Sequence, residues 1–292
     1  MTTANDGFDA KRARRGAKLS LGFSPCPNDT FIFHALVHGL VECDGLSFDE
    51  RLEDVETLNR LALAGALDVS KISYHRLGHI LGEYVLLRSG GALGRGCGPL
   101  VVAREELDPA RLAGKRIALP GRYTTAALLL RLFDPGLTDF VYLPFDRIMP
   151  AVADGSVDAG VIIHESRFTY GALGLCRLLD LGAWWEGETG APIPLGGIAA
   201  RRSLPTETLL ALERGLTASV NHAYAFPELA RDYIRAHSQE MSEEVCDAHI
   251  GLYVNDFSRT LGAEGEGAVR ILLERAEAAG IIPAWSGPLF CS

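Results

Sequence analysis

The sequence lacks long apolar runs and closely spaced cysteines. No apolar stretch approaches the ~20 residues that a membrane-spanning helix requires, so we expect no contact with a membrane. The six cysteines are scattered through the chain without a close pair, which indicates neither a disulfide framework nor a zinc ribbon. We therefore expect reduced thiols and a cytoplasmic location.

Basic residues are also in short supply. Lys and Arg number 28 against 37 Asp and Glu, a net charge of −9, and phosphate binding to nucleic acid depends on an excess of Lys and Arg. A nucleic-acid partner is thus not expected, and a small molecule is the favoured ligand class. With 292 residues, of which 48% are hydrophobic, the chain can form one large domain or two modest ones.

The N-terminal segment, residues 1–17, is polar, rich in Gly, Ala and Arg, and without periodicity, so we expect a disordered tail. Its basic cluster at residues 11–15 resembles the start of an export signal. The apolar segment that follows, residues 19–23, is far shorter than the roughly 7–15 residues of a signal-peptide core. We therefore expect no export.

Strand and helix patterns alternate from residue 18 onward. Alternation of this kind favours a parallel sheet with helices on both faces. Strands are expected at residues 18–23, 46–52, 67–72, 116–119, 140–143, 159–163 and 195–201, with a strand pair in 84–103 around a glycine-rich loop at 90–98. Helices are expected at residues 31–38, 55–64, 74–81, 124–133, 148–153, 207–225, 227–237, 243–254 and 264–279.

The chain is expected to form two α/β lobes. The C-terminal helices have no strands of their own, so we expect them to pack on the first lobe, which then comprises residues 18–101 and 200–292. The second lobe is expected at residues 102–199. A cleft between such lobes is lined by loops at the carboxyl ends of strands, and the chemistry is expected there.

One candidate anion site lies where a predicted strand leads into a helix bearing Thr124 and Thr125. Unpaired N–H groups, the positive end of the helix dipole and the hydroxyls could together bind a carboxylate. The alternative is that the threonines only cap their own helix.

His164 follows a buried-type strand and is our candidate for proton transfer. Imidazole can take and return a proton near neutral pH, and five hydrogen-bonding side chains follow directly in the sequence. The alternative is a structural histidine. His164 and Glu165 do not start a zinc-protease motif, because Phe168 occupies the position of the second histidine.

Two further segments are expected to face the cleft. Lys71, between Ser70 and Ser73 at a strand end, could neutralise an anionic ligand or be a solvated surface lysine. In the loop at residues 24–30, the side chains of Asn28, Asp29 and Thr30 could bind a ligand or cap the next helix.

No metal or organic cofactor is expected. The pairs His34/His38 and His75/His79 have one-turn spacing suited to chelation, but neither has an evident third ligand. The glycines at 90–98 match neither a dinucleotide fingerprint nor a phosphate-binding loop, and the chain has no Gly-x-Ser-x-Gly elbow of a serine hydrolase.

Several long motifs resemble the 1,4-dihydroxy-6-naphthoate synthase family of the futalosine route to menaquinone. They are FSPCPNDTF at 23–31, LEDVETLN at 52–59, RSGGALG at 88–94, IHESRFTY at 163–170 and DLGAWWE at 180–186. The resemblance runs from about residue 18 to the C-terminus and leaves the N-terminal tail unexplained.

The resemblance implies the two-lobed fold of type II periplasmic binding proteins, with a mixed sheet flanked by helices in each lobe. It further implies a lyase that converts cyclic dehypoxanthinyl futalosine to 1,4-dihydroxy-6-naphthoate and releases dihydroxyacetone without cofactor or metal. His164 matches the family's proton acceptor, and Lys71, Ile72, Ser73, Thr124 and Thr125 match its substrate-binding positions.

Two alternative functions remain open at this point. One is a chorismate dehydratase of the same pathway, and the other is a non-catalytic binding protein for a small anion, because fold alone does not determine function.

Overall fold

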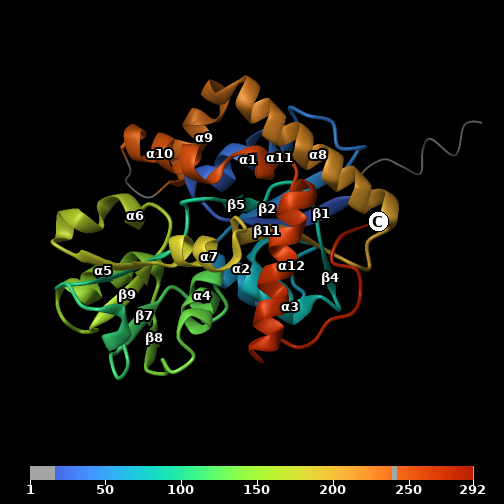
Figure 1. The fold of residues 1–292 in the computed structure, drawn as a ribbon. Coiled ribbons are helices and arrows are strands. Elements are labelled where there is room, and N and C mark those ends of the chain that lie inside the picture. The colour runs from blue at the N-terminus through green and yellow to red at the C-terminus, as the bar shows by residue number, and fades with distance from the viewer. Residues whose placement is uncertain (1–16, 239–241, 292) are drawn as a thin grey trace, which may run out of the picture.

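The computed structural model describes residues 17–238 and 242–291. The expected disordered tail therefore lies outside the described residues, apart from Ala17. The described chain forms two β-sheets, each flanked by helices (Figure 1).

The first sheet has the strand order β2-β1-β3-β11-β4, with β5 paired to β11. Its central strand β3 is buried at every position, as expected for a strand covered on both faces. The bounds are β1 Lys18–Phe23, β2 Ser47–Leu52, β3 Val69–Ser73, β4 Tyr84–Leu86, β5 Ala92–Gly94 and β11 Ile193–Arg201.

Helices from both ends of the chain cover this sheet, and in Figure 1 the C-terminal helices lie around the blue N-terminal elements. The Ser219 hydroxyl on α8 donates to the carbonyl of Ile32 on α1 at 2.6 Å, deep in a shared apolar core. The bounds are α1 Pro27–Val37, α2 Val55–Leu63, α3 Tyr74–Ile80, α8 Thr206–Ala225, α9 Arg231–His237, α10 Glu243–Tyr253, α11 Asp256–Arg259 and α12 Gly262–Ala278.

The second sheet has the order β10-β6-β9-β7-β8, and its central strand β9 is again fully buried. In Figure 1 it lies to one side of the first sheet, coloured green to yellow. Its strands are β6 Leu100–Ala103, β7 Ile117–Leu119, β8 Phe140–Tyr142, β9 Ala159–Ile162 and β10 Cys176–Asp180. Its helices are α4 Thr125–Phe133, α5 Phe145–Ala153, α6 Ser166–Thr169 and α7 Leu181–Thr189.

The all-parallel sheet suggested by strand–helix alternation is wrong, whereas the mixed sheets implied by the family resemblance are confirmed. β1 pairs in parallel with β2 and β3, and β7 with β8 and β9. Antiparallel pairing comes from β6, β10 and β11, which cross between the halves of the molecule or return along the edge of a sheet.

Two stretches of the chain differ from expectation. The segment at 84–103 is not one strand pair, because β4 joins the first sheet, β6 joins the second, and the glycine-rich loop itself contains β5. The sequence predicts no elements in residues 164–190, yet they contain α6, β10 and α7. Short strands and single-turn helices bury little surface and leave weak periodicity in the sequence.

The lobe limits at residues 101–102 and 199–200 stay a prediction. Sheet membership changes from the first sheet to the second at β6, and back to the first at β11.

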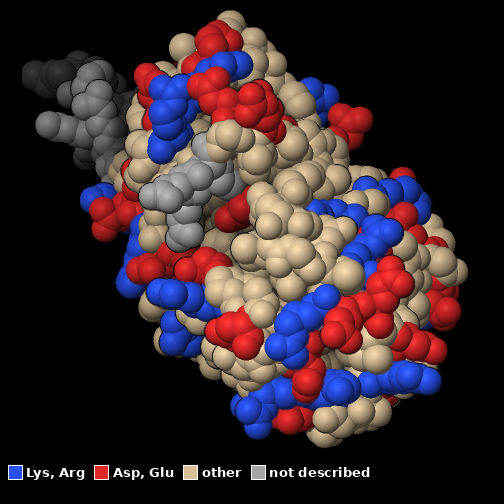
Figure 2. Space-filling view, turned by 90° about the vertical axis from the view of Figure 1, so that its left-hand side faces the viewer, with Lys and Arg blue, Asp and Glu red and all other residues tan. Residues whose placement is uncertain are grey.

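Among the described residues, no helix combines the length and apolarity that crossing a bilayer would need. Basic and acidic side chains are interspersed over the face shown in Figure 2.

Candidate functional site

A cavity of about 710 Å³, its open mouth included, lies between the two sheets. Eight of the nine predicted site residues line it, and only Thr30 does not. The lining residues are Ser24, Asn28, Asp29, Val55, Leu58, Lys71, Ile72, Ser73, Ala92, Cys97, Pro99, Thr124, Thr125, Ala126, Ile163, His164, Leu195, Gly196, His249 and Tyr253.

The loop after β1 does not cap α1 as expected. The helix begins at Pro27, whose fixed φ suits a first helical position, and its N-cap is Cys26 without a side-chain capping bond. Asn28, Asp29 and Thr30 therefore lie inside the first turn. The Thr30 hydroxyl donates to the carbonyl of Cys26 at 3.0 Å, so this side chain serves the turn and is turned away from the cavity lining.

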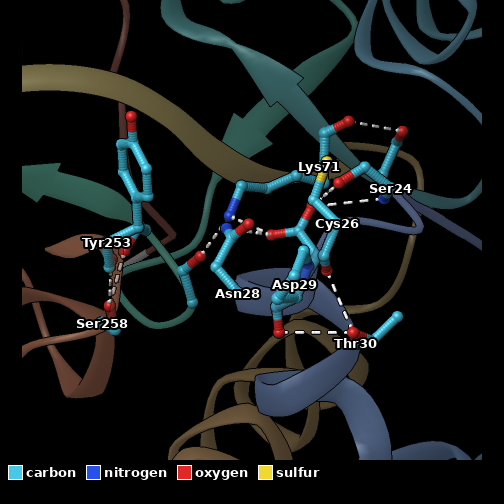
Figure 3. A network of polar contacts seen from close by, with 12 residues as sticks. Ser24, Cys26, Asn28, Asp29, Thr30, Lys71, Tyr253 and Ser258 are labelled. Atoms are coloured by element: carbon cyan, nitrogen blue, oxygen red, sulfur yellow. Dashed lines mark hydrogen bonds and ion pairs between the residues drawn. The ribbon is translucent and has the colours of Figure 1, made fainter. Parts of the chain in front are cut away.

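Asn28 and Asp29 instead belong to a buried polar network that we call the Asp29 network (Figure 3). One Asp29 oxygen accepts from Lys71 Nζ and from Asn28 Nδ2, each at 2.9 Å. The other accepts from the Ser24 hydroxyl at 2.7 Å and the Ser24 amide at 3.2 Å. Lys71 Nζ also donates to the carbonyl of Gly90 at 2.9 Å.

Lys71 is therefore not a solvated surface lysine, since only 6% of it is exposed. Its charge is balanced by Asp29, which makes the pair nearly neutral toward a ligand. A buried ammonium needs such a partner, because desolvating an unpaired charge costs several kcal/mol. Two of the three Lys71 N–H donors are used by the protein.

The start of α4 faces the cavity. The hydroxyl of Thr124, the N-cap, accepts from the Ala127 amide at 3.2 Å and donates to the carbonyl of Gly121 at 3.0 Å. The Thr125 hydroxyl donates to the carbonyl of Leu195 at 2.6 Å. Both hydroxyls thus form hydrogen bonds within the protein. The groups available to bind an anion are the N–H groups of Thr125 and Ala126, because the first turn of a helix leaves them unpaired.

His164 lies two residues beyond the end of β9 with a φ of 57°, a left-handed conformation that is uncommon outside glycine. Its Nδ1 is 3.6 Å from Cys26 Sγ, and the Phe145 ring meets it edge-on at 5.1 Å between centroids. Burial lowers the pKa of His164 below 6.5, although Glu165 and Asp29 act in the opposite direction. The neutral form, which can accept a proton, is therefore the form present at neutral pH.

Two aromatic residues of α10 line the cavity, whereas the sequence predicts only that the C-terminal helices pack on the first lobe. The His249 ring lies nearly parallel to that of His164, with centroids 6.1 Å apart, and its Nε2 is 2.9 Å from Asn28 Oδ1. Burial lowers the pKa of His249 to about 3. His249 and Tyr253 share a helix face because they are four residues apart, which is the signal that could have found them.

Cys97 also lines the cavity, and Cys26 lies behind it with its Sγ 3.6 Å from His164 Nδ1, whereas the sequence predicts only that both are reduced thiols. All six cysteines carry free thiols. Burial raises the pKa of the Cys97 thiol to about 12 and that of Cys26 further, so both are protonated at neutral pH. A thiol in this state is a poor nucleophile.

In each of the two histidine pairs, the rings lie close to one another. The ring centroids of His75 and His79 are 5.3 Å apart, and those of His34 and His38 are 4.5 Å apart. In the described part of the chain, no group of three or more His, Cys, Asp or Glu side chains is arranged to hold a metal ion.

Comparison with known sequences places the chain in a biosynthetic family. Residues 19–278 match the sequence profile of a family described as menaquinone biosynthesis. A 1,4-dihydroxy-6-naphthoate synthase of Thermus thermophilus is 56% identical over 93% of this chain and 98% of its own length. A protein of the same name from Streptomyces coelicolor is 49% identical over 91% and 95%, respectively.

Solved structures agree. The crystal structure of protein AF1704 from Archaeoglobus fulgidus has a TM-score of 0.85 at 40% identity, covering 91% of this chain and 98% of its own. The alkanesulfonate-binding protein SsuA of Xanthomonas axonopodis has a TM-score of 0.69 at 18% identity, covering 92% and 96%, which shows a shared periplasmic-binding-protein-like fold. The chain belongs to the menaquinone biosynthesis family.

Proposed function

We propose that the protein catalyses the formation of 1,4-dihydroxy-6-naphthoate, the reaction named for its two curated relatives. The expected substrate is cyclic dehypoxanthinyl futalosine, and the expected reaction class is a carbon–carbon lyase that releases dihydroxyacetone. The observation that carries the proposal is the placing of a neutral, half-buried histidine and an anion-binding helix start on one cavity.

His164 is the proposed proton acceptor. If its Nδ1–H donates to Cys26 Sγ, 3.6 Å away, the lone pair of Nε2 is free for the substrate. The positive φ of His164 supports this role, because strained conformations persist where the surrounding structure fixes them and such sites are often functional. Proton removal next to a carbonyl would start cleavage, and aromatisation of the ring would drive it.

The carboxylate of the substrate is proposed to bind at the start of α4. The unpaired N–H groups of Thr125 and Ala126 and the positive end of the helix dipole favour an anion there. The third N–H of Lys71 and the hydroxyl of Ser73, both on the opposite wall, can contact polar groups of the same molecule. Binding at both ends would orient the bond to be broken relative to His164.

We infer that the reaction takes place in the cytoplasm. The six free thiols suit a reducing compartment. The mechanism proposed for these residues uses acid–base chemistry and electrostatic stabilisation, which the side chains themselves can supply.

The test is incubation of the purified protein with cyclic dehypoxanthinyl futalosine, followed by chromatography and mass spectrometry. The expected product has the mass and the naphthalene-type absorption of 1,4-dihydroxy-6-naphthoate. Binding without conversion would support a carrier instead, and loss of water from chorismate would support the dehydratase alternative.

A further inference from the structure

The motif at residues 52–59 contributes Val55 and Leu58 to the cavity, but the mechanism above assigns no task to its charged and polar members. Asp54 caps α2 by accepting from the amides of Glu56 and Thr57 at 3.0 and 3.1 Å. This cap fixes where α2 begins. The next polar side chains, Glu56 and Asn59, lie one turn apart and face the second lobe.

Glu56 reaches across the cleft to the backbone that precedes α4. One of its oxygens accepts from the Arg122 amide at 3.1 Å, and the other from the Tyr123 amide at 3.4 Å. The approach is so close that a Cβ on Gly121 would lie 2.5 Å from Glu56 Oε2, so the carboxylate would have to move from these amides if the glycine were replaced. Hydrogen bonds to a charged acceptor are among the stronger ones in proteins.

Three further first-lobe side chains contact the same loop. Asn59, which is fully buried, donates to the carbonyl of Tyr123 at 3.3 Å, and His75 Nδ1 lies 3.2 Å from the carbonyl of Thr124. The Arg76 guanidinium is 3.5 Å from the centroid of the Tyr123 ring. Every one of these contacts joins the first lobe to residues 121–124 of the second.

The contacts end where the proposed anion site begins. Residues 121–123 lead directly to Thr124, the N-cap of α4, whose hydroxyl donates to the carbonyl of Gly121. A displacement of this loop would therefore move the cap and the unpaired N–H groups behind it. Opening the cleft would therefore also displace the N–H groups that form the anion site.

We propose that Glu56 is a positioning residue that holds the cleft closed and sets the start of α4 for the ligand. Glu56 does not line the cavity. Its effect on binding is therefore transmitted through the loop at 121–123. Only the ligand-affinity part of this proposal rests on the proposed function.

The test compares Glu56→Gln with Glu53→Gln. The second variant makes the same chemical change in the same motif, but the Glu53 carboxylate pairs with Arg51 of the same lobe, at 2.8 Å, and its side chain is 31% exposed. Glutamine at position 56 can accept from one amide, while its NH₂ group would face the other. The cleft of Glu56→Gln should open without ligand, giving a larger radius of gyration in small-angle X-ray scattering.

The affinity of Glu56→Gln for 1,4-dihydroxy-6-naphthoate should fall about 10- to 100-fold, as expected when hydrogen bonds to a charged group are lost. Saturating ligand should restore the radius of gyration. In turnover, KM should rise while kcat stays near the wild-type value. Glu53→Gln should match the wild type throughout.

A wild-type radius of gyration together with wild-type affinity in Glu56→Gln would overturn the proposal. Should that variant not fold, Glu56→Asp keeps the charge but withdraws it by one methylene, and the same two outcomes apply to it. If the wild type itself fails to bind the naphthoate, the proposed function is contradicted, while the scattering comparison still decides whether Glu56 closes the cleft.

Discussion

The two walls of the cavity are built in opposite ways. On the first-lobe wall, Asp29, Lys71 and Ser24 satisfy one another in a closed network of short hydrogen bonds. On the second-lobe wall, the polar contact of the His164 ring among the described residues is the long one to Cys26, and α4 presents unpaired N–H groups. We call the first wall saturated, because its charged groups are paired and Lys71 keeps only one N–H for a ligand. We call the second wall unsaturated, because the N–H groups at the start of α4 are left for a ligand. A saturated wall is a rigid support for such a site.

The largest expected effect follows from removing the base on the unsaturated wall. His164→Gln keeps size and hydrogen bonding but cannot take a proton near neutral pH, so kcat should fall about 10²- to 10⁴-fold while substrate still binds. Steady-state kinetics with a binding titration measure both. His38→Gln, the same change at an exposed position, is the control, and near-normal turnover of His164→Gln would rule out the base.

On the saturated wall, removing a charged group should mainly lower the stability of the protein. Lys71→Met leaves the Asp29 carboxylate buried without its cation, which typically costs about 3–5 kcal/mol in the free energy of unfolding. The matched control is Lys18→Met, since Lys18 and Asp49 form a pair at 2.8 Å with side chains 62% and 71% exposed. That change should cost no more than about 1 kcal/mol.

Urea unfolding measures both losses. Lys71→Met combined with Asp29→Asn should lose less than the sum of the single changes, because the two groups interact directly. If Lys71→Met and Lys18→Met lower the free energy of unfolding equally, the first-lobe wall is not a rigid support.

Periodicity predicted the main elements of the fold. β1 has the bounds expected from the alternation of Leu19, Leu21 and Phe23, and α4 begins within one residue of the expected position. Strand direction was not predictable, because β11 pairs antiparallel with β3 across more than 100 residues of chain that contain the whole second sheet. The sequence of a strand does not specify which distant strand it pairs with or in which direction.

The candidate site was predictable where a residue lies near the carboxyl end of a strand or in the loop that follows it. His164, Lys71 and Thr124 meet this rule, and all three line the cavity. The partners were not predictable, because Asp29 meets Lys71, and His249 meets Asn28, only after folding. His249 is separated from Asn28 by 221 residues and lies on a helix that looks structural.

A smaller effect should result from changing the hydroxyls at the start of α4. Replacing Thr124 and Thr125 by valine removes the cap and the bond to Leu195, so the N–H groups lose their alignment. Affinity for the naphthoate should fall about 10-fold, whereas that for its methyl ester should change little, because the ester has no charge for the helix dipole to attract.

Isothermal titration with both ligands measures the difference, and serine at both positions is the control because it keeps the hydroxyls. The lost cap should also cost about 1 kcal/mol of stability whether or not ligand binds there. Equal losses for acid and ester would show that the threonines serve the fold alone.

The smallest effect is expected in the pH dependence of the unsaturated wall. Burial lowers the pKa of His164, so its neutral form persists to a lower pH than that of an exposed histidine. kcat/KM should therefore be flat around neutrality and fall as pH decreases through a midpoint below about 6.5, the ordinary pKa of histidine. Stability should also fall in this range, because the unfolded chain takes up a proton below about 6.5 that the folded protein resists.

The two effects of pH are separable. Kinetics should be measured only where circular dichroism shows a folded protein. The residual kcat/KM of His164→Gln should not show the fall at low pH, which is the acid limb of the profile. Burial also lowers the pKa of His75, to about 3, and His75 contacts the carbonyl of Thr124 without lining the cavity itself, so His75→Phe should reduce the pH dependence of stability and leave the kinetic midpoint in place. A kinetic midpoint above 6.5, or one that moves with His75→Phe, would assign the limb to a group other than His164.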